Sequence, residues 1–225
     1  MSRKLTKNRK EILEKISKKK YSLEEAVLLI KEISFVKFDE SVDISVHLGI
    51  DVRLSNQMVR GTVKLPHGTG KNICILALVT KEKELEAKEA GADYVGLDFI
   101  EKIKSGWIDI IIATPSVMNQ LGSISKILGS KGLMPNPKMD TVSTNPGKSI
   151  KEMKSGRISF RADRYGIVHA SIGRVSFSNQ YLLDNIKEFM ITMIRNKPST
   201  SKGSYIKSIH LSTTMSNSIS LDSKS

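Results

Sequence analysis

Hydrophobic and polar side chains alternate strictly along residues 42–50. The apolar side of this segment holds Val42, Ile44, Val46, Leu48 and Ile50. A period of two predicts a strand with one buried face and one polar face. The same alternation returns in residues 158–172, on both sides of a short turn, and predicts a hairpin there. It returns once more in residues 205–215, which predicts a last strand.

Helical periodicity surrounds these strands. Thr6 should cap a helix over residues 7–18, and Ser22 with Glu25 has the pattern of a capping box at the start of a second helix. Ser178 should cap a long helix near the end of the chain. The apolar stripe of that helix consists of Leu182, Ile186, Phe189 and Met193.

The middle of the chain has a different hydrophobic pattern. The near-continuous apolar runs 73–79 and 109–113 are typical of strands covered on both faces, and a short strand is expected at 94–96. Helices are predicted over residues 81–90, 98–104 and 146–154. Repeating strand and helix units of this kind predict a parallel sheet with helices on its faces.

Together these patterns predict two domains. An α+β terminal domain, with an antiparallel sheet and helices, comprises residues 1–66 and 158–225. It is interrupted by an inserted α/β domain, residues 67–157, with a parallel, Rossmann-like sheet. The breaker residues of segment 66–70 mark the first crossing between the domains. Paired crossings predict a hinge, made of Leu65, Pro66, His67, Arg157 and Ile158.

The charge of the chain adds a class of partner to this fold. The 225 residues carry a formal net charge of +13, which in a soluble chain favours a polyanion, most often nucleic acid. Segment 1–66 holds 14 basic and 9 acidic side chains, segment 158–225 holds 9 and 4, and segment 67–157 holds 13 and 10. The excess positive charge therefore lies mainly on the two ends, although a generally basic proteome is an alternative explanation.

Several classes of protein are disfavoured by the sequence. No apolar run approaches the roughly 20 residues of a membrane helix, and the basic N-terminal segment lacks the apolar stretch of a secretory signal. The single cysteine, Cys74, excludes an internal disulfide and a cysteine-based metal cluster. We therefore expect a globular protein without a membrane partner.

The rival function is a nucleotide-using enzyme built on the inserted domain. Segment 68–70, Gly-Thr-Gly, could be taken for a phosphate loop, but it precedes a strand. Phosphate-binding glycine loops follow a strand and open a helix. The four histidines also lack the spacing of metal ligands. The sequence therefore predicts no enzyme activity, no cofactor and no metal.

Five segments closely resemble the bacterial type of the ribosomal protein L-one family, which forms the mobile side stalk of the large subunit. They are LGID at 48–51, VRGTV at 59–63, LPHGTG at 65–70, GLMPNPK at 132–138 and STTM at 212–215. The chain departs from the family pattern at Ser216, where glycine is common, and at Ala162, where asparagine is common. It also has Ser130 and Lys131 where the family has Pro and Arg.

This resemblance implies a non-enzymatic constituent of the large ribosomal subunit. The domain built from both termini would bind large-subunit ribosomal RNA, while the inserted domain swings relative to it. The stalk would contact exit-site transfer RNA and assist its release, and the protein would repress translation through the leader of its own messenger RNA. The implied partners are these three RNAs and other ribosomal components. The implied location is the ribosome of the cytoplasm, with a plastid as the alternative.

The resemblance also implies a set of RNA-binding residues. By motif they are Phe38, Glu40, Arg161, Asp163, Arg164, Gly166, His169, Thr213, Thr214 and Met215. The polar strand faces add Ser212, and Lys37 stands beside Phe38. Phe38 itself could be a stacking platform or an anchor in the core. An ordinary solvated sheet face is the alternative to RNA binding by the polar strand residues, since any half-buried strand leaves one face polar.

Overall fold

The computed structural model describes residues 6–16, 19–96, 103 and 106–222. The chain divides into two compact units, one made of Met1–Gly70 and Phe160–Ser225 and the other of Lys71–Ser159. The two crossings thus lie a few residues after the predicted boundaries. The helix predicted over residues 98–104 lies outside the described residues, apart from Ile103.

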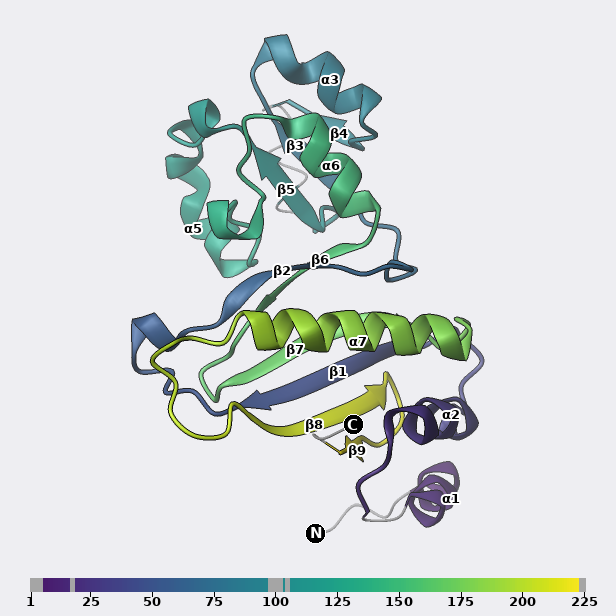
Figure 1. Ribbon diagram of the computed structural model, residues 1–225. Coiled ribbons are helices and arrows are strands. Elements are labelled where there is room, and N and C mark those ends of the chain that lie inside the picture. Colours follow the sequence, from purple (N-terminus) through teal and green to yellow (C-terminus); the bar gives the residue numbers. More distant parts are fainter. Residues whose placement is uncertain (1–5, 17–18, 97–102, 104–105, 223–225) are drawn as a thin grey trace. The chain divides into compact units, whose positions relative to one another are not determined.

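Unit 1, formed by both ends of the chain, contains an antiparallel sheet covered by helices (Figure 1). Its main elements are α1 Lys7–Lys15, α2 Leu23–Ile33, β1 Ser41–Leu48, β7 Ile167–Arg174, α7 Asn179–Arg195, β8 Ile206–Thr213 and β9 Ile219–Leu221. The strand order is β7-β1-β8-β9, and every neighbouring pair is antiparallel. This arrangement confirms the α+β class predicted for the terminal segments.

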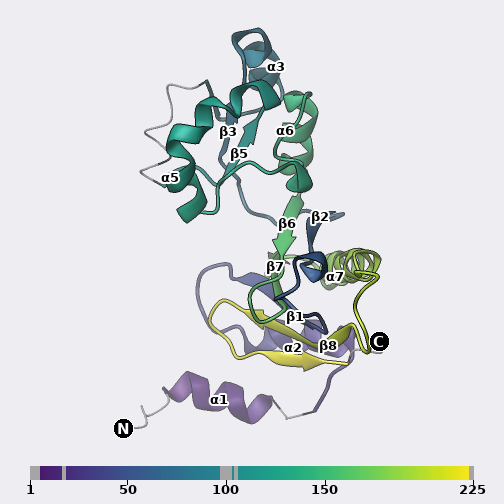
Figure 2. The ribbon, with the colours of Figure 1, turned by 90° about the vertical axis from the view of Figure 1, so that its left-hand side faces the viewer.

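The alternating pattern placed the strand faces correctly. Val42, Ile44, Val46 and Leu48 of β1 are at most 1% exposed, as are Leu182, Ile186, Phe189 and Met193 of α7. Both Figure 1 and Figure 2 show α7 on one side of this sheet and α1 on the other. The core of unit 1 therefore lies between the apolar face of the sheet and α7, with α2 packed beside them.

The hairpin predicted over residues 158–172 is wrong, because only its turn forms. The strand β6 Arg157–Arg161 pairs with β2 Arg60–Lys64, a strand that the sequence pattern did not separate. A single bridge between Ala162 and Val168 joins the two predicted arms, and β7 pairs with β1 instead. A period of two fixes which face of a strand is buried, but it does not fix the partner strand.

Two of the three predicted helix caps are present. Ser22 and Glu25 form the full capping box of α2, and the hydroxyl of Ser178 accepts a hydrogen bond from the Tyr181 backbone N–H at the start of α7. The Thr6 cap is wrong, since its side chain makes no cap hydrogen bond, and α1 ends at Lys15 rather than Lys18. Only Ile12 of this helix is buried, so little packing holds its last turn in place.

Unit 2 is a separate α/β layer with a parallel sheet in the order β4-β3-β5. Its strands and α-helices are β3 Ile75–Leu78, β4 Tyr94–Val95, β5 Ile110–Ala113, α3 Glu84–Glu89, α5 Ser125–Ser130 and α6 Pro146–Lys154. Short 3-10 helices span Ser55–Gln57 in unit 1 and Lys81–Lys83, Pro115–Val117, Gln120–Ile124 and Pro137–Met139 in unit 2. Successive residues of β3 belong to two different core clusters, so both faces of the strand are covered. The predicted inserted α/β fold is confirmed.

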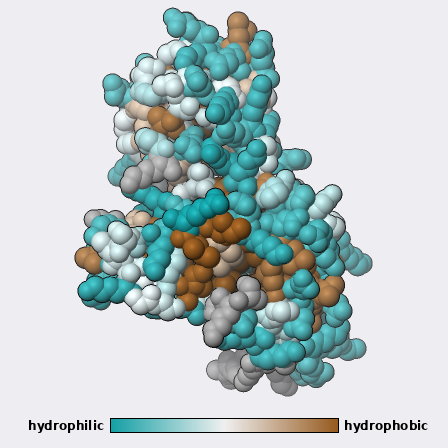
Figure 3. All heavy atoms as spheres, viewed as in Figure 1, coloured by the Kyte–Doolittle hydropathy of each residue, from teal (hydrophilic) through white to brown (hydrophobic). Residues whose placement is uncertain are grey.

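The two units also differ at the surface. Figure 3 shows apolar side chains gathered in the middle of the visible face of unit 1, whereas hydrophilic side chains cover most of the visible face of unit 2. Large exposed hydrophobic residues of unit 1 include Ile191 and Ile194 of α7 and Phe38 and Met215 at the sheet. Single exposed hydrophobic residues are normal on a protein surface. Whether one of them belongs to a binding site therefore depends on which side chains surround it.

Candidate nucleic-acid interface

The predicted site residues fall into two groups at opposite ends of β1. The edge cluster, before the first residue of β1 and beside it at the end of β8, consists of Lys37, Phe38, Glu40, Ser212, Thr213, Thr214 and Met215. The turn cluster, near the last residue of β1, consists of Arg161, Asp163, Arg164 and Gly166. Seven residue steps of a strand separate the two ends by about 23 Å. A ligand that touches both groups must therefore be long.

Glu40 holds the edge cluster together from inside. Its side chain is 1% exposed, and one carboxylate oxygen accepts a hydrogen bond from the backbone N–H of Met215 at 2.8 Å. The other oxygen accepts from the hydroxyl of Ser34 at 2.6 Å. Glu40 therefore joins the segment before β1 to the segment after β8, and its carboxylate does not lie on the surface.

The neighbours of Glu40 form an exposed surface. Phe38 is 54% exposed and Met215 is 55% exposed, and Lys37 and Thr214 are exposed as well. The hydroxyl oxygen of Thr214 accepts from the Ser41 backbone N–H at 3.2 Å, which leaves its proton free to donate to a ligand. Of the two alternatives for Phe38, its exposure favours the platform over the core anchor.

Ser216, the residue that replaces the common glycine, folds back onto the strand. Its hydroxyl lies 2.6 Å from the hydroxyl of Thr213 and accepts from the Thr213 backbone N–H at 3.3 Å. Thr213 is 3% exposed, so this pair closes the end of β8 internally. The serine side chain is thus accommodated by a local hydrogen bond. Ala162, the other departure, is 3% exposed and faces the core, as its parity predicted.

Asp163 shapes the turn cluster. One carboxylate oxygen accepts from the backbone N–H groups of Tyr165 and Ile167, each at 2.8 Å. Burial opposes the charged form, but these two hydrogen bonds and the nearby ring of His169 hold the pKa of this carboxyl below its usual value. Gly166 has a φ of 75°, and a Cβ there would lie 3.3 Å from the carbonyl oxygen of Leu48. Glycine is required at this position by both backbone conformation and space.

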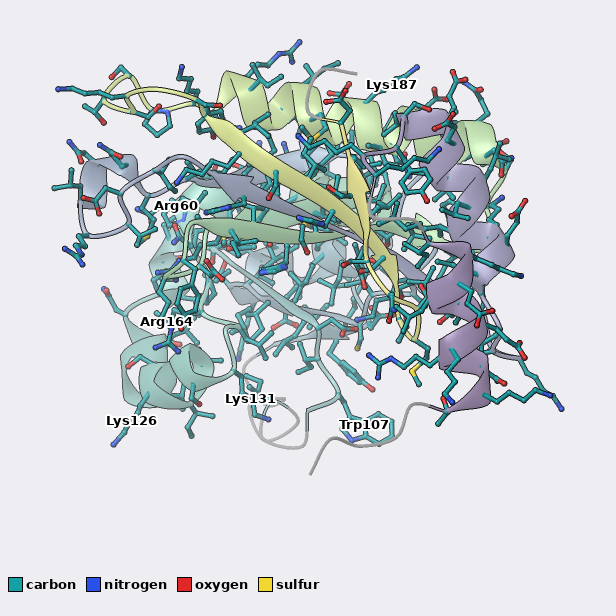
Figure 4. The ribbon with its side chains drawn as sticks, turned by 90° about the horizontal axis from the view of Figure 1, so that it is seen from below. Arg60, Trp107, Lys126, Lys131, Arg164 and Lys187 are labelled. Atoms are coloured by element: carbon teal, nitrogen blue, oxygen red, sulfur yellow. The ribbon has the colours of Figure 1, made fainter. Side chains whose placement is uncertain are left out.

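The turn presents cations and an aromatic ring. Arg161 and Arg164 are exposed, and the Arg164 guanidinium lies 5.8 Å from the ring centre of Tyr165. Tyr165 is 71% exposed and was not among the predicted site residues. An aromatic residue between Arg and Gly in a turn is the signal that could have found it, because a turn directs such a side chain outward. Arg60, at the start of β2, lies on the same side of unit 1 as Arg164 (Figure 4).

The polar face of the sheet connects the two clusters. Across the strands, Ser45 lies between His169 and His210, and Asp43 lies between Ser171 and Ser212. The Ser45 hydroxyl is 3.0 Å from the His169 ring, whose other nitrogen is 3.7 Å from the Asp163 carboxylate. His169 therefore joins the polar face to the turn cluster.

Asp43 is the one carboxylate of β1 on this polar face. Burial raises its pKa above the usual value, while the Ser171 hydroxyl, Arg174 and His169 act in the opposite direction. The polar face therefore carries hydroxyls and imidazoles around one half-buried carboxylate.

The predicted hinge residues make contacts within different units. The His67 backbone N–H donates to Asn185 of α7 at 3.1 Å, and the His67 ring stacks on Tyr181 with a centroid distance of 4.0 Å. Leu65 is fully buried and Pro66 is exposed. Arg157 forms ion pairs with Asp140 and Glu152 of unit 2, and Ile158 is half-buried.

The rest of the described chain offers little for enzyme chemistry. No group of three or more His, Cys, Asp or Glu side chains within residues 6–16, 19–96, 103 and 106–222 could hold a metal ion. The Gly68 carbonyl in the supposed phosphate loop accepts from Asn185 at 2.9 Å, so part of this loop is committed to α7. None of the helices in the described segments has the length and apolar character needed to cross a bilayer.

Comparison with known proteins shows the family of the chain. Residues 30–217 match the model of the ribosomal protein L1p/L10e family. The "Large ribosomal subunit protein uL1" of Flavobacterium psychrophilum is 57% identical over 225 residues, which cover 98% of each chain. The protein of the same name from Bacteroides thetaiotaomicron is 58% identical over 226 residues, which cover 99% of this chain and 97% of the relative. The chain therefore belongs to the ribosomal protein L1p/L10e family.

Proposed function

We propose that this chain is a constituent of the large ribosomal subunit and binds large-subunit ribosomal RNA through unit 1. The observation that carries the proposal is the edge cluster, where Phe38 and Met215 are both more than half exposed beside Lys37 and Thr214. The buried Glu40 holds these segments in place, so the surface is organised before a ligand arrives. Membership of a family of ribosomal proteins confirms that the chain is not an enzyme.

The chemistry of the surface suits a folded RNA. Hydroxyls, imidazoles and guanidinium groups along the polar face can donate to phosphates and 2′-hydroxyls. Within the described strands of the sheet, aromatic side chains are absent from this face, so recognition of several stacked bases is not favoured. The exposed side chains of Phe38 and Met215 at the edge cluster, and of Tyr165 at the turn cluster, are suited to contact with ribose or single bases.

The finer functions follow from this surface as part of the same proposal. A messenger RNA leader with the shape of the ribosomal site would occupy the same edge cluster, and repression would result from that competition. Unit 2 would swing on the two crossings, with residues 65–67 and 157–158 at the hinge. The stalk so formed would contact exit-site transfer RNA and assist its release.

Met215→Asp should weaken binding to the stalk region of the large-subunit ribosomal RNA about tenfold to a hundredfold. The change places a carboxylate on the exposed edge cluster, where it repels phosphates and loses an apolar contact. The backbone N–H of Met215 still donates to Glu40, so folding should be kept. The measurement is filter binding with an in-vitro transcript of the stalk.

Ile194→Asp is the matched control for this experiment. Ile194 is 56% exposed on α7, close to the 55% of Met215, and the substitution changes the net charge by the same amount. We expect its affinity to stay within about twofold of the original protein, because α7 covers the other face of the sheet. Equal losses in both variants would mean that net charge, and not the edge cluster, governs binding.

Neutralising the predicted phosphate contacts should reduce the salt dependence of binding. Each of Lys37→Gln, Arg161→Gln and Arg164→Gln should lower the slope of log affinity against log salt by about 0.7–0.9. The loss should be the same for the stalk transcript and for an unrelated structured RNA, since phosphates carry no sequence information. Lys187→Gln, on α7, is the control and should leave the slope unchanged. An altered preference between the two RNAs at constant slope would show that these side chains read shape or bases instead.

A further inference from the structure

A groove lies in unit 1, between α1 and the polar side of β8 and β9. It has a volume of about 750 Å³. Its lining residues come from α1, from the segment after it, and from the end of the sheet: Arg9, Leu13, Ile16, Lys19, Lys20, His210, Ser216, Asn217, Ser218 and Ser220. Figure 4, which views the molecule from below, shows α1 alongside the strands of this sheet.

The charged side chains that line the groove are all basic. Three of its lining residues are basic, Arg9, Lys19 and Lys20, and none is a carboxylate. Within the described segments, no carboxylate lies within ion-pair distance of these three side chains. The ammonium group of Lys19 lies 4.9 Å from the centre of the Tyr21 ring, which positions it at the groove.

A second hollow beside α1 shows that this charge is not a property of the helix as a whole. This smaller hollow of about 210 Å³ is lined by Glu11 and Glu32 as well as Lys15. Acidic and basic side chains are thus mixed in the hollow between α1 and α2. Only basic charged side chains line the groove between α1 and the sheet. Segregation of this kind produces a local positive potential that attracts an anion.

The groove is continuous with the candidate interface. Ser216 follows Met215 of the edge cluster directly along the chain, and residues 216–218 line the groove. His210 belongs to the same cross-strand row as Ser45 and His169. An RNA strand on the polar face would therefore reach the groove without leaving the surface.

Much of the groove lies outside the part of the chain that matches the family model. That match begins at residue 30 and ends at residue 217, whereas all three cations precede it and Ser218 and Ser220 follow it. The groove is thus not part of the edge cluster that the family motifs indicate.

We propose that this groove is a further RNA-binding site, in which Arg9, Lys19 and Lys20 bind backbone phosphates and the side chains of Asn217, Ser218 and Ser220 donate to phosphate or ribose. The proposal rests on the proposed RNA-binding function and extends it from the edge cluster to α1. The apolar side chains of Leu13 and Ile16 supply a surface on which ribose can pack. An acidic protein segment is the other class of ligand that such charge could attract, and continuity with the edge cluster favours RNA.

The test compares two triple variants of the full chain. The groove variant is Arg9→Gln, Lys19→Gln and Lys20→Gln, and the control is Lys88→Gln, Lys187→Gln and Arg195→Gln. Both sets remove three exposed cations, and none of the control positions, which lie on α3 and α7, lines the groove. Binding to the stalk transcript is measured over a series of salt concentrations. A photoreactive side chain at Leu13 reports whether the RNA lies in the groove, and thermal unfolding confirms the fold of each variant.

We expect the groove variant to lower the salt slope by about 2, to weaken binding at least tenfold at moderate salt, and to leave the thermal midpoint unchanged. The control should change the slope by less than half a unit, and the Leu13 probe should crosslink to RNA. Equal slopes for the two triple variants, or an absence of crosslinks, would overturn the proposal. If Met215→Asp weakens binding while the groove variant does not, only this inference fails. If the original protein does not bind the transcript, the proposed function fails as well.

Discussion

Asn185→Ala should lower the free energy of unfolding by about 3 kcal/mol and the thermal midpoint by about 6–12 °C. Asn185 is fully buried on α7 and makes three hydrogen bonds to backbone groups. Its amide donates to the carbonyl oxygens of Gly68 at 2.9 Å and Ile172 at 2.8 Å, and its oxygen accepts from the His67 N–H at 3.1 Å. Truncation removes the partner of all three groups, of which the Ile172 carbonyl is buried and the other two are partly buried. Each buried group left unpaired costs about 1–3 kcal/mol.

Asn196→Ala provides a matched control. Asn196 follows the last turn of α7, is exposed, and donates only to the Thr192 carbonyl at 2.9 Å. Water can replace that bond, so the thermal midpoint should move by no more than about 2 °C. Both variants are measured by circular dichroism during thermal unfolding. A midpoint for Asn185→Ala as close to the original as that of the control would show that Asn185 does not secure the 66–70 turn.

Asn185 also shows where the sequence pattern stops being informative. It lies between Leu182 and Ile186 on the apolar stripe that correctly predicted the buried side of α7. A helical stripe indicates which positions are buried, but a polar residue within it needs partners from elsewhere in the chain. Those partners include Gly68, 117 residues away in sequence, and Ile172, 13 residues away, and they could not be named without the fold.

The sequence predicted where strands and helices lie better than it predicted which strands pair with one another. Alternation located β1, β7 and β8 and their buried faces, and the continuous apolar runs located β3 and β5, because both patterns report only local burial. The pairing of β6 with β2 depends on where the whole chain brings these strands together. The sequence therefore predicted the α+β and α/β classes but not the pairing of β2 with β6.

Glu40, one of the predicted site residues, has a buried side chain, and its contact with RNA stays a prediction. Glu40 has the same parity as Val42 and Ile44, so alternation alone would have directed its side chain inward. The family motif instead placed it at the RNA-contacting edge. Lys19 and Lys20 are visible in the sequence as basic residues, but that they line one groove with His210 and Ser220 could not be inferred. That arrangement depends on how α1 lies on the sheet.

Glu40→Ala should lower the free energy of unfolding by about 3 kcal/mol and weaken binding to the stalk transcript at least tenfold. The buried carboxylate accepts from the Met215 backbone N–H at 2.8 Å and from the Ser34 hydroxyl at 2.6 Å. Removing it leaves both donors unpaired and frees the segment that carries Thr214 and Met215. RNA binding then requires that this segment be ordered again, which costs affinity.

Glu40→Gln separates this positioning role from a direct role of the negative charge. The amide oxygen can still accept from the Met215 N–H, and the amide N–H₂ can donate to the Ser34 hydroxyl, which also accepts hydrogen bonds. Glu40→Gln should therefore recover most of the stability and most of the RNA affinity that Glu40→Ala loses. Thermal unfolding and filter binding are measured for both variants. If Glu40→Gln folded normally yet bound RNA as weakly as Glu40→Ala, the carboxylate itself would interact with the RNA or its counterions, and its buried position would describe only the free protein.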